Sequence, residues 1–276
     1  VTVTSILMAR KDACPTYDAA NTMCTIFAYP TITQVNRTTG ATVSTIGLCP
    51  GQLTAPSSMT WDSTSQPLFN IATTVYVIDV SCPAFSPNFD YVFSQLGKNR
   101  IGGLKNTTNQ VIEFETRVRI DGVNAWASPI YNSGYMTNVL YDTNTSHYFT
   151  TNLNALSGKG TSVTYSLVTS SASALGGYGA TKVPCSDLDT ATGVFRISAG
   201  LCAAGESYSA SFSGGTATSP VFYVLKTKAV DEYGQFTTRD VLLQFATTTD
   251  NAPVITRNPS TASLTLTPGA TTTVTY

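Results

Sequence analysis

The chain has 276 residues, of which only 11% are charged, and its formal net charge is −1. A surface so nearly neutral excludes charge-driven binding of nucleic acid or of an anionic membrane. No stretch reaches the roughly 20 consecutive apolar residues of a membrane span, so we expect no membrane insertion in this segment. Thr, Ser and aromatic residues are frequent, which favours strands over helices.

Alternation of apolar and polar residues predicts strands throughout the chain. In the first half they cover residues 1–6, 24–29, 41–46, 71–80, 89–93 and 111–120, with 71–80 as a central strand. In the second half they cover 161–168, 193–197, 208–212, 221–225 and 236–248. Frequent turn signals between short strands are typical of antiparallel β-sandwiches, and the pattern predicts no amphipathic helix.

One boundary phrase occurs twice. The run 111–120 leads into Asp121-Gly-Val-Asn-Ala-Trp-Ala-Ser-Pro129, and the run 236–248 leads into Thr249-Asp-Asn-Ala-Pro253. A strand followed by a short polar linker and Pro is how one sandwich passes to the next in a tandem array. We therefore predict an all-β fold with two tandem antiparallel β-sandwiches, at 1–126 and 127–250. Residues 251–276 would form a linker and the opening strands of an incomplete third repeat, so we expect the natural polypeptide to continue.

The cysteines form an even set without a C-x-x-C pair, and the single histidine, His147, cannot complete a Cys/His zinc site. Disulfides formed in an oxidising compartment fit this set better. If the repeat is real, the two cysteines of the second unit must pair with each other, because that unit has no others. We expect the pairs Cys185–Cys202, Cys14–Cys24 and Cys49–Cys82, the last two chosen among several possible pairings.

Three N-glycosylation sequons begin at Asn36, Asn106 and Asn144. A chain this rich in Asn, Ser and Thr would contain about as many by chance. Each sequon falls in a polar, turn-like stretch that could accommodate a glycan. We expect at least one of them to be glycosylated if the source is eukaryotic.

Four segments of the second unit carry a family resemblance. They are Thr164-Tyr-Ser-Leu-Val, the stretch 188–197 with its Asp-Thr-Ala-Thr-Gly-Val-Phe core, the stretch 224–234 with Ala-Val-Asp-Glu-Tyr-Gly, and Thr249-Asp-Asn-Ala-Pro-Val-Ile. In this order they resemble the conserved strands, hairpin and linker of cadherin-like and immunoglobulin-like extracellular repeats. The resemblance covers residues 127–255, and the first unit shows less of it. It implies tandem β-sandwiches outside the cell.

The resemblance also suggests a calcium site, because carboxylate and carbonyl oxygens bind Ca²⁺ at the linkers between cadherin repeats. The candidate ligands are Asp231, Asp250 and Asn251. Thr249 stands where the family places further acidic or amide ligands, which leaves too few carboxylates for a tight site. We expect Asp231 to form an Asx turn and Asp250 to cap the linker, with no cofactor bound.

No motif or cluster in the sequence predicts a catalytic residue. The chain lacks G-x-S-x-G, P-loop and H-E-x-x-H patterns. His147 is expected to be exposed. Glu113 and Glu115 could in principle serve a glycosidase, but strand alternation predicts that both lie on the solvent face. We therefore expect no enzyme.

The sequence favours a non-enzymatic structural module of a secreted or cell-surface glycoprotein, such as an adhesin, a stalk or a filament subunit. Its partners would be other copies of itself or neighbouring repeats, joined through strand addition by residues 261–266 and 271–276. Trp126, inside the first linker, is expected to pack the two modules together. The alternatives are a carbohydrate-binding module using Trp61 and surface tyrosines, or the ectodomain of a cell-adhesion receptor.

Overall fold

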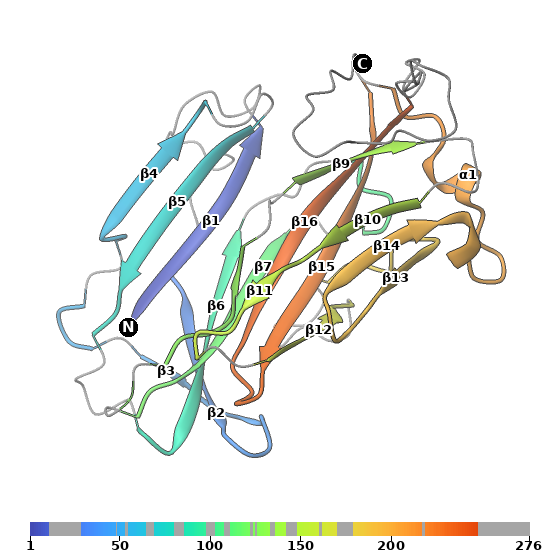
Figure 1. Ribbon diagram of the computed structural model, residues 1–276. Helices are drawn as coiled ribbons and strands as arrows, with labels where there is room; N and C mark the ends of the chain where they lie inside the picture. Colours follow the sequence, from blue (N-terminus) through green and yellow to red (C-terminus); the bar gives the residue numbers. More distant parts are fainter. Residues whose placement is uncertain are drawn as a thin grey trace, which may run out of the picture.

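The structure is a computed structural model of the whole chain (Figure 1). It describes residues 1–10, 29–47, 49–52, 55–64, 69–79, 86–97, 103–107, 111–121, 124, 126–132, 136–141, 148–159, 162–169, 179–216 and 219–247. The second copy of the boundary phrase and the proposed third repeat, 251–276, lie outside these residues, as does the predicted strand at 24–29 except for Tyr29.

The first half of the chain forms strands β1 to β7. Their bounds are β1 Thr2–Arg10, β2 Thr31–Asn36, β3 Thr42–Ile46, β4 Ser58–Asp62, β5 Phe69–Val77, β6 Phe89–Gly97 and β7 Ile112–Arg119. β5 lies at the centre of an antiparallel sheet with the order β1-β5-β4, so the prediction of a central strand in this region is confirmed.

The second half is also built of strands. Their bounds are β8 Ile130–Tyr131, β9 Met136–Tyr141, β10 Tyr148–Asn152, β11 Ala155–Leu156, β12 Val163–Leu167, β13 Ser186–Leu188, β14 Val194–Ser198, β15 Val221–Asp231 and β16 Phe236–Thr247. The described residues add only a 3-10 turn, Ala199–Leu201, and the five-residue helix α1, Tyr208–Phe212. The all-β prediction is confirmed.

One large sheet runs through both halves in the order β12-β15-β16-β7-β6-β2-β3. All its pairs are antiparallel except that of β9, which lies parallel to the later part of β16. The two halves therefore lie edge to edge in a shared sheet (Figure 1). The division into domains at 126/127 stays a prediction, because a continuous sheet crosses that boundary in space.

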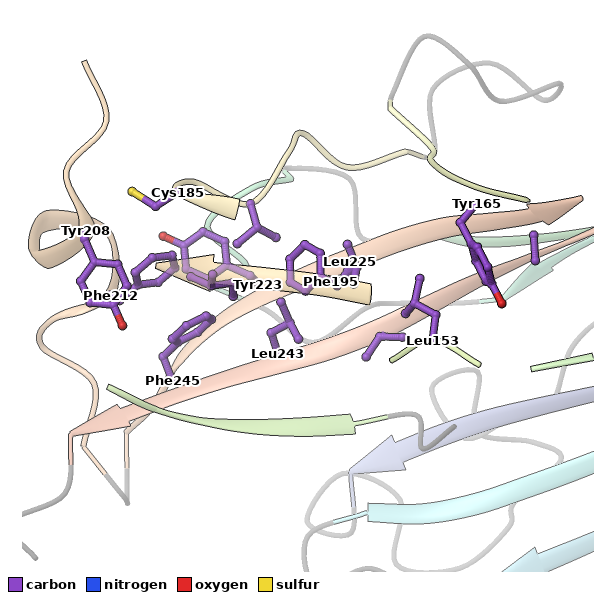
Figure 2. Close-up of a cluster of buried hydrophobic side chains, with 14 of the residues drawn as sticks. Leu153, Tyr165, Cys185, Phe195, Tyr208, Phe212, Tyr223, Leu225, Leu243 and Phe245 are labelled. Carbon is purple, nitrogen blue, oxygen red and sulfur yellow. The ribbon is translucent and has the colours of Figure 1, made fainter. Parts of the chain in front are cut away.

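Each half has its own hydrophobic core. In the first half, Val3, Ile32, Tyr76 and Phe93 pack together from four different strands. In the second half, the sheet β10-β14-β13 packs on β15 and β16, and its core contains Phe195, Ile197, Leu225 and Leu243 among others (Figure 2). Each of these two clusters buries apolar surface within one half. A small third cluster, Val35, Val92 and Phe236, joins the halves where β7 meets β16.

The segment 208–212 was expected to be a strand, and that prediction is wrong. Tyr208 and Phe212 are both buried, which fits a period of two as well as the i, i+4 spacing of a helix. The helix is favoured by its N-cap residue, Ser207, whose hydroxyl accepts a hydrogen bond from the backbone N–H of Ala210. The ring of Phe212 then stacks on that of Phe245, with centroids 4.3 Å apart (Figure 2).

A disulfide joins Cys185 to Cys202, with sulfur atoms 2.02 Å apart, as the sequence predicts. It ties the start of β13 to the chain just before α1. Cys185 is fully buried and belongs to the core of the second half.

Removing this disulfide should destabilise the protein measurably. The bond closes a loop over 17 residues, for which loss of the cross-link costs about 3 kcal/mol through the entropy of the unfolded chain. We expect the double variant Cys185→Ala/Cys202→Ala to lose about that much unfolding free energy in urea titrations under oxidising conditions. A loss below about 1 kcal/mol would show that the bridge does not stabilise the core.

Candidate functional site: the seam between the two halves

The two halves meet where β7 runs beside the start of β16. Only two residue pairs are in register across this junction, Arg117 with Phe236 and Thr116 with Thr237. By contrast, β15 and β16 share ten pairs within the second half. We call the junction of β7 with β16, together with the side chains that bridge it, the seam.

Beyond the two backbone pairs of the seam, side chains form hydrogen bonds between β7 and β16. The backbone N–H of Glu115 donates to Oγ1 of Thr238 at 2.8 Å, and the Thr238 hydroxyl donates to the Glu115 carbonyl oxygen at 3.3 Å. At the other end, the backbone N–H of Arg119 donates to Oε1 of Gln235 at 2.6 Å. Thr238 and Gln235 are both buried, so these bonds are shielded from water.

Charged side chains line one face of the seam. Across β15 and β16 the register pairs Lys226 with Asp240 and Lys228 with Thr238, and Thr238 in turn contacts Glu115 of β7. Nζ of Lys226 donates to the backbone carbonyl oxygen of Glu113 at 2.8 Å and lies 3.8 Å from its carboxylate Oε2. The side chains of Lys226 and Glu113 are 1% and 0% exposed. The seam therefore contains a buried ion pair between the halves.

The expectation that Glu113 and Glu115 face solvent is wrong. Both are buried, at 0% and 5% exposure. Alternation correctly separates the two faces of β7, but it does not say which faces are covered. Their face of the sheet is buried as well, as Ser94 on β6 and Lys226 on β15 show. Neither carboxylate is open to a substrate as a solvent-face pair would be.

Burial raises the pKa of Glu115 to about 7, and the neighbouring Glu113 adds to that rise, while Lys226 and Lys228 act against it. Burial also lowers the pKa of Lys228, against the pull of Glu115. Oε1 of Glu115 has no hydrogen-bond partner among the described residues. A buried carboxylate without a full set of partners favours its neutral form. Glu115 therefore titrates near neutral pH.

A second charged group on the same face is centred on Asp90 of β6. Its carboxylate is fully buried and contacts three guanidinium groups: Nε of Arg37 at 3.1 Å, Nη2 of Arg117 at 2.8 Å and Nε of Arg119 at 3.4 Å. These contacts fasten the end of β7 to β6 and to the turn after β2. The part of β7 that meets β16 is thus held firmly within the first half.

Trp126 joins the halves beside the seam, as the sequence predicts. Its ring packs edge-on against that of Tyr233, with centroids 5.2 Å apart. The cations of Arg119 and Lys159 each lie 4.6 Å from the Trp126 ring centroid. Its Nε1–H donates to the Asp121 carboxylate at 2.7 Å. Tyr233 and Lys159 belong to the second half, so this tryptophan packs the predicted modules together.

Asn106 forms a third connection, which we call the Asn106 clamp. Its side chain is held against β15: Oδ1 accepts from the backbone N–H of Val224 at 3.0 Å, and Nδ2 donates to the Val224 carbonyl oxygen at 2.8 Å. Nδ2 also donates to the carbonyl oxygen of Thr181 at 2.7 Å. Residues 105–107 thereby attach the first half to the far edge of β15, across which Lys105 also donates to Phe222.

The Asn106 clamp bears on the glycosylation expectation. Asn106 is 5% exposed, and Nδ2, the atom that would carry a glycan, makes both donated hydrogen bonds. This geometry opposes a glycan at Asn106. Asn36 is half-buried at the β2–β3 turn and accepts hydrogen bonds from the backbone N–H groups of Thr38 and Thr39 through Oδ1. Glycosylation of Asn36 stays a prediction.

Asp231 ends β15 and forms the turn to β16. Its Oδ1 accepts the backbone N–H groups of Tyr233 and Gln235, both at 2.9 Å, which confirms the expected Asx turn. Burial raises the pKa of Asp231, against the effect of those two N–H groups. In the described part of the chain, no three His, Cys, Asp or Glu side chains gather where they could hold a metal.

Other residues singled out in the sequence are only partly placed by the structure. Trp61 lies on β4 opposite Ala72. Cys49 is disulfide-bonded. The remaining candidates fall outside the described residues, and they are Cys14, Cys24, Cys82, Asn144, His147, Asp250 and Asn251.

The seam residues were missed as a site because their signal is long-range. Glu115 and Thr238 are 123 positions apart in sequence. The local sequence of neither strand indicates that the two strands pair. The one available hint was the unusual run of charges on β7 in a chain with few charges.

Among the described residues, no helix has the length and apolar character needed to cross a membrane.

No protein-family model matches the chain, and no curated protein sequence does. Solved structures similar to it include repeats EC1–3 of mouse clustered PcdhgC3, at 14% identity and a TM-score of 0.29 over 74% of this chain and 56% of that one. Another is protocadherin gamma B7, cadherin domains 1–4, at 14% identity and a TM-score of 0.30 over 76% and 43%.

A third is the Ig1–2 module of the Drosophila receptor protein tyrosine phosphatase DLAR, at 13% identity and a TM-score of 0.27 over 88% of this chain and 90% of that one. The chain spans about half the length of the protocadherin structures it matches.

Proposed function

We propose that this chain is a non-enzymatic structural module of a secreted or cell-surface glycoprotein, and that it assembles with other copies of itself. The continuous sheet through both halves is the observation that carries the proposal. Such a sheet transmits load from one half to the other through hydrogen bonds rather than through a flexible linker. The disulfide in the second half supports an oxidising, extracellular location.

The edge of the shared sheet supports assembly by strand addition. β3 is the terminal strand, and among the described strands it pairs only with β2. Residues 42–45 of β3 are all exposed, and Val43 is 51% exposed. An open edge presents unpaired N–H and C=O groups to another strand. Residues 261–266 and 271–276 of a second copy have the alternating sequence that such an added strand needs.

A charge on the open edge should prevent this assembly. We expect Val43→Lys to shift the protein from oligomers or fibres to monomers, because a lysine on an edge strand repels an incoming strand and resists burial. Val77→Lys is the matched control: Val77 is 55% exposed, but it lies on β5, which has a partner strand on both sides. Sedimentation velocity and electron microscopy of both variants give the readout.

A chain shortened to end at Thr247 tests the other half of the strand-addition model. It should remain monomeric, since it lacks the segments expected to add to β3. Assembly that survives both Val43→Lys and this truncation would refute strand addition. A protein that stays monomeric at high concentration without any substitution would refute self-assembly altogether.

A further inference from the structure

We propose that the seam is a pH-responsive joint, in which β7 loosens from β16 as the pH rises through neutrality while each half keeps its own core. The groups that make the response are the buried Glu115 and the charges that face it. This inference stands apart from assembly at β3, because the two features lie at different places in the sheet.

The bonding of the seam permits local opening. Two residue pairs and a few side-chain hydrogen bonds hold β7 to β16. The two larger hydrophobic cores share no buried residues. A small third cluster, in which Phe236 contacts Val35 and Val92, spans the seam, and opening separates this cluster but leaves both larger cores intact. Trp126 and the Asn106 clamp keep the halves tethered when the strands part. Opening of the seam is therefore a local event, distinct from unfolding of either half.

Among the described residues, charged groups near Glu115 lie on β7 and β15. Glu113 and Arg117 are on the same face of β7, and the charges of Glu113, Lys226 and Lys228 act on Glu115. Asp240 of β16 is paired with Lys226. On β6 the opposite residue is Ser94, with Asp90 further along that face. Glu113 already forms the close ion pair with Lys226. When Glu115 ionises, it places a second negative charge in the same buried site, and this destabilises the closed seam.

The direction of the response follows from linkage. In the closed seam burial holds the pKa of Glu115 at about 7, whereas in an open seam it returns towards its ordinary value of 4.5. The open state therefore binds fewer protons between these two values, and rising pH favours it. Between pH 5.5 and pH 8 the opening equilibrium should increase by roughly 30-fold, and below pH 4.5 or well above pH 7 it should be flat.

Amide hydrogen exchange of the full chain, followed by mass spectrometry at several pH values, measures this opening directly. After correction for intrinsic exchange rates, peptides from β7 and from the start of β16 should lose protection by roughly 30-fold between pH 5.5 and pH 8. Peptides from β10 and β14, which lie in the second core, serve as the internal reference and should not change. The Glu115→Gln variant should abolish the pH dependence of the seam peptides.

Two further variants test whether the pH response comes from titration of Glu115 or only from a structural role of its side chain. Glu113→Gln removes a like charge and should move the midpoint of the response to lower pH, whereas Lys228→Met removes a cation and should move it to higher pH. They also keep the test decisive if Glu115→Gln does not fold. Equal pH responses in seam and reference peptides would overturn the proposal, as would shifts of the same sign in both variants.

Discussion

Replacing Lys226 by methionine should lower the free energy of unfolding by about 3–5 kcal/mol. Methionine matches the length of the lysine stem but removes the cation that contacts Glu113. The Glu113 carboxylate is fully buried, so its charge would lose a partner in a site that water does not reach. Urea denaturation at neutral pH, monitored by tyrosine and tryptophan fluorescence, measures the loss.

The control for this prediction is a lysine without a buried partner. Lys182 is exposed in the second half, and Lys182→Met should change stability by no more than about 0.5 kcal/mol. The double variant Lys226→Met/Glu113→Leu should recover much of the loss, since replacing both members of a buried ion pair by apolar residues is often neutral. If the double variant is less stable than Lys226→Met alone, the ion pair is not the cause.

Local features of the fold could be predicted from the sequence because each depends on neighbours in the chain. The Asx turn at Asp231 follows from the Asp-x-x-Gly spacing before β16. The pairing of Cys185 with Cys202 follows from their isolation in the second unit. The very short strands β8 and β11 escaped detection, because two residues show no periodicity.

The seam could not be predicted because its strands meet only in the folded chain. The sequence suggested two modules in succession with a linker between them. In the structure the linker does not separate the sheets: β7 pairs with β16, and the halves share one sheet. Glu113 and Glu115 lie on a face of the sheet where Ser94 and Lys226 are buried as well. Both this burial and the junction depend on contacts that exist only in the folded chain.

Asn106→Ala should destabilise the protein by about 2–4 kcal/mol, because the substitution removes three hydrogen bonds at once. It leaves the backbone N–H and carbonyl groups of Val224 without the partner they have in the Asn106 clamp, and Val224 is only 3% exposed. Amide exchange of peptides from 221–225 should rise with the loss of global stability. Thermal and urea denaturation measure the size of the effect.

The sequon at Asn106 provides a matched control for this prediction. Thr108→Ala removes the glycosylation signal but leaves the Asn106 side chain in place. If Asn106 acts as a clamp, Thr108→Ala retains the stability that Asn106→Ala loses, and protein from a eukaryotic host carries no glycan on Asn106. A glycan found on Asn106 in the folded, secreted protein would contradict the clamp, since Nδ2 cannot both carry a sugar and donate to Val224 and Thr181. The attachment of residues 105–107 to β15 would then need another explanation.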